Sequence, residues 1–235
     1  MQGLGKTVVG TTLALLAGLV ATPVHAVDLG DPIYQKDLKG AFRAEVVLED
    51  FNRDVKLDSR HWYGSDSHGM DLGLYMARVT FPVNNDAAFY LDAGLVNDDD
   101  ADSTPLTLGL GGRIKIYDQR PIKLSVVGNA HWVPSYDLDL PGKPSNSFYE
   151  LGAGLLVSGE FATDRRFTLV PYGGLALSVL KGHIDGDGYN TSYHEKSIAV
   201  GTLGVSGIIN KTFTVRLEGR FIGDSSLSAS FGMAF

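Results

Sequence analysis

The 235 residues include no cysteine, which excludes a disulfide framework, a thiolate zinc site and a cysteine nucleophile. The sequence also lacks a surplus of positive charge. Its formal net charge is −7, so we expect no nucleic-acid partner. It contains no Walker loop, no dinucleotide-binding fingerprint and no metal-protease helix motif, so we expect no cofactor. Beyond its first residues, no stretch approaches the roughly 18 consecutive apolar residues of a transmembrane helix.

The N-terminus has the pattern of a secretory signal peptide. Lys6 precedes an uncharged stretch over residues 8–21, and Val24 and Ala26 occupy the −3 and −1 positions of a cleavage site. A membrane anchor is the alternative, but the stretch is short for a span of about 20 residues. We expect cleavage after Ala26, a short periplasmic N-terminal segment over residues 27–39 and one domain over residues 40–235.

Apolar and polar residues alternate with period 2 through most of the remaining chain, which predicts strands. In 106–116, leucines and isoleucines occupy one face, while Arg113 and Lys115 occupy the other. The same pattern runs through residues 40–48, 122–132, 149–161, 213–221 and the last ten residues, and less clearly through 70–81, 87–96, 167–180 and 197–209. In 70–81 we place Tyr75 and Phe81 on the outer face. We expect Leu110→Arg to be costly and Gly109→Ser, which points inward, to be mild.

Short and long links alternate between these strands. Residues 82–86, 118–121, 162–166 and 210–212 form short links, and residues 52–68, 97–105, 134–147 and 181–196 form longer polar links. The pattern predicts an all-β, up-and-down antiparallel barrel of ten strands. Eight strands remain possible, because the last link, 223–225, is short where a long one is due.

A soluble barrel and a transmembrane barrel both show this alternation, so other features must distinguish them. The signal peptide, strands long enough for a tilted bilayer crossing of about 9–11 residues and the short-turn, long-loop asymmetry favour a transmembrane β-barrel. Aromatic residues near the strand ends fit an interfacial girdle. They are Phe81, Phe89, Tyr149, Phe161, Phe167, Phe213, Phe221 and Phe235.

The signal peptide, the meander and a last strand ending in Ser-Phe-Gly-Met-Ala-Phe235 resemble small Gram-negative outer-membrane barrels. Residues 108–117, 129–136 and 148–152 are similar to the YfaZ-type barrels, and Val170-Pro-Tyr-Gly-Gly174 resembles a strand start of the OmpA-like porin group. The resemblance implies the bacterial outer membrane, with its lipid and lipopolysaccharide as partners. It also implies an assembly signal at Phe231, Met233 and Phe235 that is read by the barrel-assembly machinery.

The polar face of the strands is predicted to line the barrel interior. The interior residues that we single out are Arg43, Glu45, Asp92, Arg113, Lys115, Lys123, Glu150, Glu160, Arg216, Glu218 and Arg220. They describe either a narrow pore with a basic constriction or a paired polar core that only holds the barrel round. We favour the core, because the interior of a barrel of eight to ten strands is about filled by side chains.

Other chemistry has weaker support. His131 is followed by Ser135 and Asp137, but the intervening Pro134 places both in a predicted loop, so we assign no catalytic residue and expect no enzyme. The acidic positions Asp98, Asp99, Asp100, Asp185 and Asp187 could contact a divalent cation, but no complete metal-binding loop surrounds them. We assign no metal site.

The sequence therefore predicts a structural or narrow-pore, porin-like outer-membrane barrel that is a monomer. The alternative is a surface protein whose loops bind ions, lipopolysaccharide, a host or a phage. A barrel enzyme acting on lipid A has less support.

Overall fold

The computed structural model describes residues 30–58, 67–98, 101–119, 121–140, 142–164, 166–186, 189–221 and 225–235. The predicted signal peptide over residues 1–26 lies outside this part. Within it the chain is almost entirely β-strand, with one short 3-10 helix, η1 (Gln35–Asp37). None of the helices in these ranges has the length and apolar character needed to cross a membrane.

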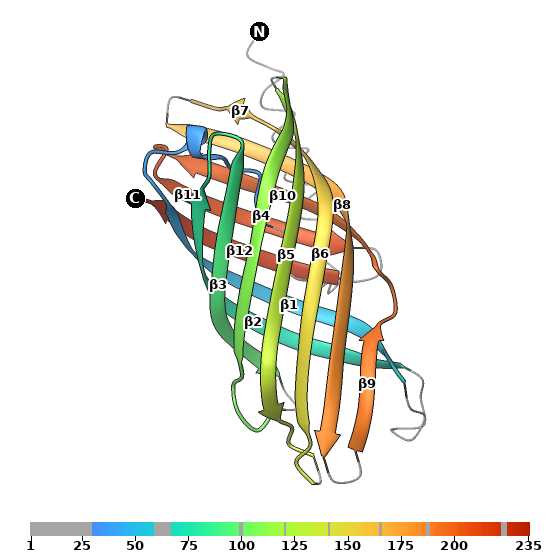
Figure 1. Ribbon diagram of the computed structural model, residues 1–235. Helices are drawn as coiled ribbons and strands as arrows, with labels where there is room; N and C mark the ends of the chain where they lie inside the picture. The colour runs from blue at the N-terminus through green and yellow to red at the C-terminus, as the bar shows by residue number, and fades with distance from the viewer. Residues whose placement is uncertain are drawn as a thin grey trace.

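Ten antiparallel strands form a closed ring (Figure 1). They are β1 (Arg43–Leu57), β2 (Ser67–Pro82), β3 (Ala87–Asp98), β4 (Leu106–Gln119), β5 (Ile122–Asp137), β6 (Ser145–Gly159), β8 (Phe167–Gly186), β10 (Ala199–Ile209), β11 (Phe213–Phe221) and β12 (Ser225–Ala234). Strand β1 pairs with β12, and β8 pairs with β10, so the ring has no open edge. The predicted barrel of ten strands is confirmed.

The two ends of the barrel differ. One end, here called the turn end, carries the short links, the start of β1 and the C-terminus. The other, here called the loop end, carries the longer links (Figure 1). Figure 1 also shows β3 to β6 and β8 running along the front of the barrel, with β1, β2 and β10 to β12 crossing steeply behind them.

Two short strands lie outside the ring of ten. Strand β7 (Phe161–Ala162) pairs with the beginning of β8 at the turn end. Strand β9 (Tyr189–Glu195) forms a hairpin with the end of β8 and pairs with β1 at residues 55–57. At the loop end, β9 therefore takes the place that β10, β11 and β12 occupy nearer the turn end. The predicted long link over 181–196 is mostly strand.

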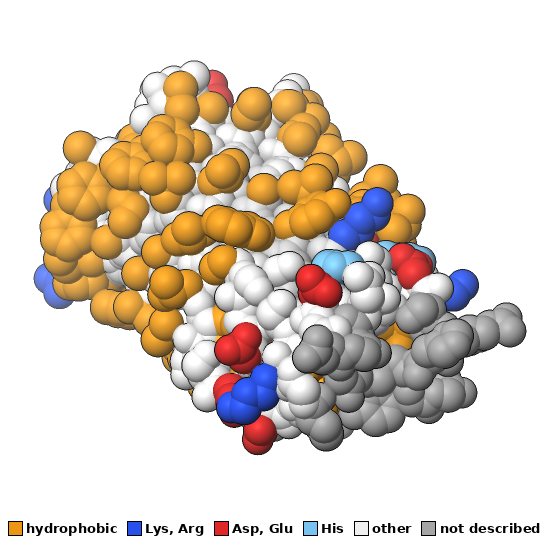
Figure 2. All heavy atoms as spheres, turned by 60° about the horizontal axis from the view of Figure 1, so that its bottom comes forward, with side chains coloured by type: hydrophobic (Ala, Val, Ile, Leu, Met, Phe, Trp, Pro, Cys, Tyr) orange, Lys and Arg blue, Asp and Glu red, His pale blue; other side chains and the backbone are white. Residues whose placement is uncertain are grey.

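The outer face of the ring is a continuous apolar belt. Along β4 it is formed by Leu106, Leu108, Leu110, Ile114 and Ile116, all of which are exposed, as the alternation predicts. Figure 2, which brings the loop end forward, shows hydrophobic side chains over the wall and charged side chains gathered near the loop end.

Towards the loop end, the outward positions of the strands become polar and many inward positions become apolar. On β1, Val46 and Leu48 face outward, but the following outward positions are polar and Phe51 and Val55 face inward. On β8 the outward Leu177 and Val179 are followed by an outward Lys181, while Leu180 is fully buried. The barrel is thus apolar outside and polar inside near the turn end, and polar outside and apolar inside near the loop end.

This exchange of polarity explains why several predicted links are too long. Strand β1 continues to Leu57, β5 continues to Asp137 and β8 continues to Gly186, so parts of 52–68, 134–147 and 181–196 belong to the wall. Those extensions have apolar inward positions and polar outward ones. A sequence search that requires an apolar outer face therefore ends each strand before its extension.

Candidate functional site

The barrel interior is filled in three layers, and these layers are the candidate site. Near the loop end, inward side chains form a hydrophobic cluster, here called the apolar cluster. Its buried members are Val47, Phe51, Val55, Leu72, Leu74, Met76, Val96, Val133, Tyr136, Leu138, Phe148, Leu180, Ile184 and Tyr193. They come from β1, β2, β3, β5, β6, β8 and β9, together with Leu138 after β5, so they join several strands of the ring through the interior.

The second layer is a network of buried ion pairs, which overlaps the apolar cluster along β1, where Arg53 lies between Phe51 and Val55. The Arg78 guanidinium binds both carboxylate oxygens of Asp92, with Nε and Nη2 each 2.7 Å from an oxygen. Arg53 reaches Glu150 at 2.9 Å and Glu195 at 3.1 Å. Such paired geometry offsets the cost of removing charges from water.

The network continues around the other side of the ring. Arg220 Nε donates to Glu218 at 2.8 Å, and Tyr172 donates its hydroxyl to the same carboxylate at 2.6 Å. Arg216 Nε donates to Ser230 Oγ at 3.2 Å. Side chains from β8, β11 and β12 are therefore joined across the interior by charge-assisted hydrogen bonds.

The third layer, at the turn end, is supplied by the N-terminal segment. Residues 30–34 belong to no strand of the wall, yet all of them are buried inside the ring. The sequence analysis expects residues 27–39 to form a short periplasmic segment and does not foresee that part of it enters the barrel.

Asp31 is the centre of this layer. Its carboxylate receives two hydrogen bonds from Arg43, each of 3.0 Å, and one of 3.0 Å from Arg113 Nη1. Arg113 Nη1 also donates to the Asp31 carbonyl oxygen at 2.6 Å. Burial by itself raises the pKa of the Asp31 carboxyl, but the charges of Arg43 and Arg113 outweigh it and lower the pKa to about 2.

The rest of the segment fits the wall closely. Ile33 packs against Val170 of β8 and Ile208 of β10. The Tyr34 hydroxyl donates to Ser125 Oγ at 2.6 Å, and the Lys123 ammonium lies 5.7 Å from the Tyr34 ring centroid. The segment is thus held by an ion pair, an apolar contact and an aromatic contact with cations.

The structure places most of the predicted interior residues inside the ring. Nine of them are buried: Arg43, Glu45, Asp92, Arg113, Lys123, Glu150, Arg216, Glu218 and Arg220. Lys115 and Glu160 are partly buried near the turn end, where Lys115 pairs with Asp86 at 2.6 Å and Glu160 with Lys123 at 2.9 Å.

The expectation that Gly109→Ser is mild depends on one neighbouring side chain. A Cβ atom added to Gly109 would lie 2.5 Å from Cε1 of the His131 ring, so the substitution requires this imidazole to move. The imidazole of His131 lies 3.3 Å from Asp92 and occupies the space that the glycine leaves.

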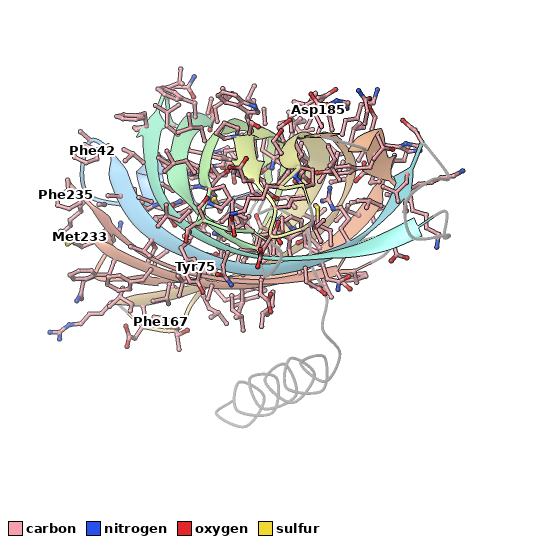
Figure 3. The ribbon with its side chains drawn as sticks, turned by 90° about the horizontal axis from the view of Figure 1, so that it is seen from below. Phe42, Tyr75, Phe167, Asp185, Met233 and Phe235 are labelled. Carbon is pink, nitrogen blue, oxygen red and sulfur yellow. The ribbon has the colours of Figure 1, made fainter. Side chains whose placement is uncertain are left out.

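The predicted assembly residues lie on the outer face of β12. Phe231 and Phe235 are exposed and Met233 is partly buried. Figure 3 shows Met233, Phe235 and Phe42 side by side at one edge of the barrel. Strand β12 pairs with β1 from Ala234 opposite Arg43 to Ser225 opposite Asn52, as a closed barrel requires.

The weaker candidates that lie among the described residues do not assemble into a site. His131 is buried inside the ring, whereas Ser135 and Asp137 are exposed, so the three do not form a triad. Asp98 accepts a hydrogen bond of 2.6 Å from the Tyr136 hydroxyl, and Asp185 is exposed.

Three of the acidic candidates, Asp99, Asp100 and Asp187, lie outside the described residues. Within the described ranges, no group of three or more His, Cys, Asp or Glu side chains could hold a metal ion.

Sequence reasoning missed Asp31, Tyr34 and Arg53. Arg53 lies in the part of β1 whose outward positions are polar, and its flanking inward residues Phe51 and Val55 are the signal that could have placed it. The segment around Asp31 has no periodic pattern. Its position depends on the ion pairs of Asp31 and on the contacts of Ile33 and Tyr34 inside the barrel.

No protein-family model matches the sequence, and no curated protein matches it. Among solved structures, the chain is similar to the translocator domain of the autotransporter NalP from Neisseria meningitidis. The identity is 10% and the TM-score 0.47, over 83% of this chain and 88% of that chain.

Neisserial surface protein A is 14% identical, with a TM-score of 0.39 over 83% of this chain and 98% of that chain. The outer membrane protease OmpT from Escherichia coli is 7% identical, with a TM-score of 0.41 over 88% of this chain and 100% of that chain. The resemblance to outer-membrane barrels noted in the sequence thus recurs among solved structures. It is too distant to carry a function.

Proposed function

We propose that the protein is an outer-membrane barrel with a structural role and without a conducting pore. The observation that carries this proposal is the filled interior, which holds the apolar cluster, the ion-pair network and the N-terminal segment. A hydrated pathway for solutes would have to pass these buried and mutually paired side chains.

The apolar belt supports the membrane part of the proposal. Ten residue steps separate Leu106 from Ile116, which corresponds to about 33 Å along a strand and about 25 Å across a bilayer at a tilt near 40°. This height agrees with the roughly 25 Å apolar band of outer-membrane barrels. In this arrangement the turn end faces the periplasm and the loop end faces outward.

Conductance in planar lipid bilayers tests the closed interior. We expect purified protein to give no current steps, or small ones. Large steps with cation selectivity would refute the proposal, because the interior carries paired charges and no open path.

Fractionation tests the location. The mature protein should start at Val27, accompany the outer membrane and migrate differently on a gel before and after boiling. Soluble periplasmic recovery would refute the membrane assignment.

A second candidate function, surface binding of lipopolysaccharide, is favoured by a hollow of about 460 Å³ on the outer wall at the loop end. It is lined by Trp132, Tyr149, Lys181, His183 and His194, among others. His194 pairs with Asp58 in the same lining at 3.2 Å, which leaves Lys181 and His183 as the groups that suit a phosphate of a lipid anchored in the apolar belt.

Tryptophan fluorescence tests this second candidate. In a Trp62→Phe background, Trp132 is the remaining tryptophan, and its emission should change on titration with lipid A in detergent micelles. Lys181→Ala should weaken the response, whereas Lys196→Ala, an exposed lysine outside the hollow, should not. Equal responses from both variants would reject the site.

A further inference from the structure

The space that residues 30–34 fill at the turn end is lined by three cations, and we call it the vestibule. Two of these cations have acidic partners on the wall, since Glu45 pairs with Arg43 at 2.8 Å and Glu160 pairs with Lys123 at 2.9 Å. Arg43 of β1 and Arg113 of β4 both bind the Asp31 carboxylate, and Lys123 of β5 lies beside Tyr34. In the part of the chain that the structure describes, the only acid within ion-pair distance of Arg113 is Asp31. If Asp31 departs, Arg43 keeps its partner Glu45, whereas Arg113 has no acid within ion-pair distance among the described residues.

The two arginines also offer more hydrogen-bond donors than Asp31 uses. The Nε atoms of Arg43 and Arg113 are buried and have no hydrogen-bond partner among the described residues. A carboxylate has two oxygens, whereas phosphate and sulfate have four, and planar guanidinium groups bind such oxyanions in bidentate fashion. The pair of arginines is thus better matched to a tetrahedral oxyanion than to the carboxylate that occupies it.

The segment that carries Asp31 lies outside the backbone ladders that close the barrel. Residues 30–34 contribute to no strand, and they contact the wall through side-chain hydrogen bonds, an apolar packing contact and aromatic contacts with cations. The ring is closed independently by the pairing of β1 with β12. Parts of a fold that are held outside its hydrogen-bonded ladders open at lower free energy than the ladders themselves.

We propose that the vestibule is an oxyanion-binding site whose resident ligand is the carboxylate of Asp31, and that phosphate takes its place when the N-terminal segment withdraws. The site is a blind pocket, since the ion-pair network and the apolar cluster lie between it and the loop end. Phosphate would be held there without passing through. The inference requires the closed barrel but neither the location nor the surface binding proposed above.

The absence of cysteine makes withdrawal measurable in the full mature chain. Ile33 is 1% exposed, so the thiol of Ile33→Cys should react slowly with a water-soluble maleimide. Phosphate should accelerate this labelling in a saturable way, compared with chloride at the same ionic strength. Asp31→Asn in the same background should raise the labelling rate about tenfold or more, as expected for the loss of charge-assisted hydrogen bonds.

The matched variant is Arg113→Gln, which removes one of the two arginines and should abolish the specific effect of phosphate. Equal acceleration by chloride and phosphate would overturn the proposal, because it indicates screening alone. A phosphate effect that survives in Arg113→Gln would overturn it too. The gel shift between unheated and boiled samples verifies that each variant retains the barrel.

Thermal unfolding provides an independent measurement that needs no cysteine. In Asp31→Asn, phosphate should raise the unfolding temperature relative to chloride, because it binds the folded state where the carboxylate is lost. The rise should be smaller in the wild type, in which Asp31 competes. The absence of phosphate stabilisation in a folded Asp31→Asn barrel would overturn the proposal. Should that variant fail to fold, phosphate-dependent labelling of Ile33→Cys and its loss in Arg113→Gln decide the question.

Discussion

The ring of Phe42, at the start of the first strand, stacks on the ring of Phe235, the last residue, with centroids 5.2 Å apart and planes inclined by 16°. The backbones of the two residues are joined as well, since Phe235 N donates to Phe42 O at 2.9 Å. The row of rings continues through Phe81 to Phe89. Phe235 thus belongs both to the seam that closes the barrel and to the row of aromatic rings.

Deletion of Phe235 should impair insertion, because it removes the ring that covers the closing seam and the last backbone contacts with β1. Secretion should continue, so we expect processed protein to accumulate in the periplasm or to be degraded. Quantitative blotting of membrane and periplasmic fractions at native expression measures this. Outer-membrane levels equal to those of the wild type would assign Phe235 no part in assembly.

Gly40→Ala should weaken the same seam. Gly40 has a φ of +131°, and a Cβ there would lie 2.2 Å from the Phe235 carbonyl oxygen, so the substitution is both strained and obstructed. Gly69→Ala is the control, since nothing lies within 4 Å of its added Cβ. The unfolding midpoint in urea should fall for the first variant and stay nearly unchanged for the second. Equal midpoints would contradict the described approach of the two chain ends.

The period-2 pattern was sufficient to predict the wall near the turn end. Leu110 outside and Arg113 inside follow directly from it, because lipid and a narrow interior impose opposite polarities on alternate residues. Beyond Leu48 on β1, the outward positions become polar. A rule that requires an apolar outward face therefore ends the strand too early. The pairing of β9 with β1 could not be predicted, since it depends on where β10 to β12 end.

The interior partners were predictable as a class but not as pairs. The charges on the inward face must be neutralised, yet which acid meets Arg53 depends on the stagger between strands that lie far apart in the sequence. The role of Asp31 was hidden for a different reason. Its segment has no strand pattern, and Asp31 gains its position from Arg43 and Arg113, which lie later in the sequence on β1 and β4.

Leu110→Arg should destabilise the barrel by about 2–4 kcal/mol, the cost of an arginine on the lipid face near the bilayer midplane. Leu110 is exposed on the outer wall, opposite Leu91 on one side and Ala130 on the other. Leu110→Ala is the matched control and should cost much less. Reversible unfolding in urea, in lipid vesicles, measures both. Wild-type stability of the arginine variant would place this face away from lipid.

Leu180→Ala should cost about 2–5 kcal/mol, because it leaves a cavity in the apolar cluster. Leu180 is 0% exposed, whereas Leu177, three residues earlier on β8, is 59% exposed on the outer wall. Leu177→Ala should therefore change stability far less. A comparison of their unfolding free energies tests whether the loop end has a packed interior. Similar losses in the two variants would argue against it.

Arg53→Ala should be among the most damaging substitutions in the interior, with a cost of about 3–5 kcal/mol, because it leaves buried carboxylates without their cation. Arg53 holds Glu150 of β6 and Glu195 of β9, so its loss affects the junction at which β9 closes on β1. Adding Glu195→Gln should recover part of the stability by removing one of the stranded charges, whereas Glu195→Gln alone should be destabilising. A double-mutant cycle measured by urea unfolding quantifies this coupling. Strictly additive effects would mean that the two side chains do not interact in the folded barrel.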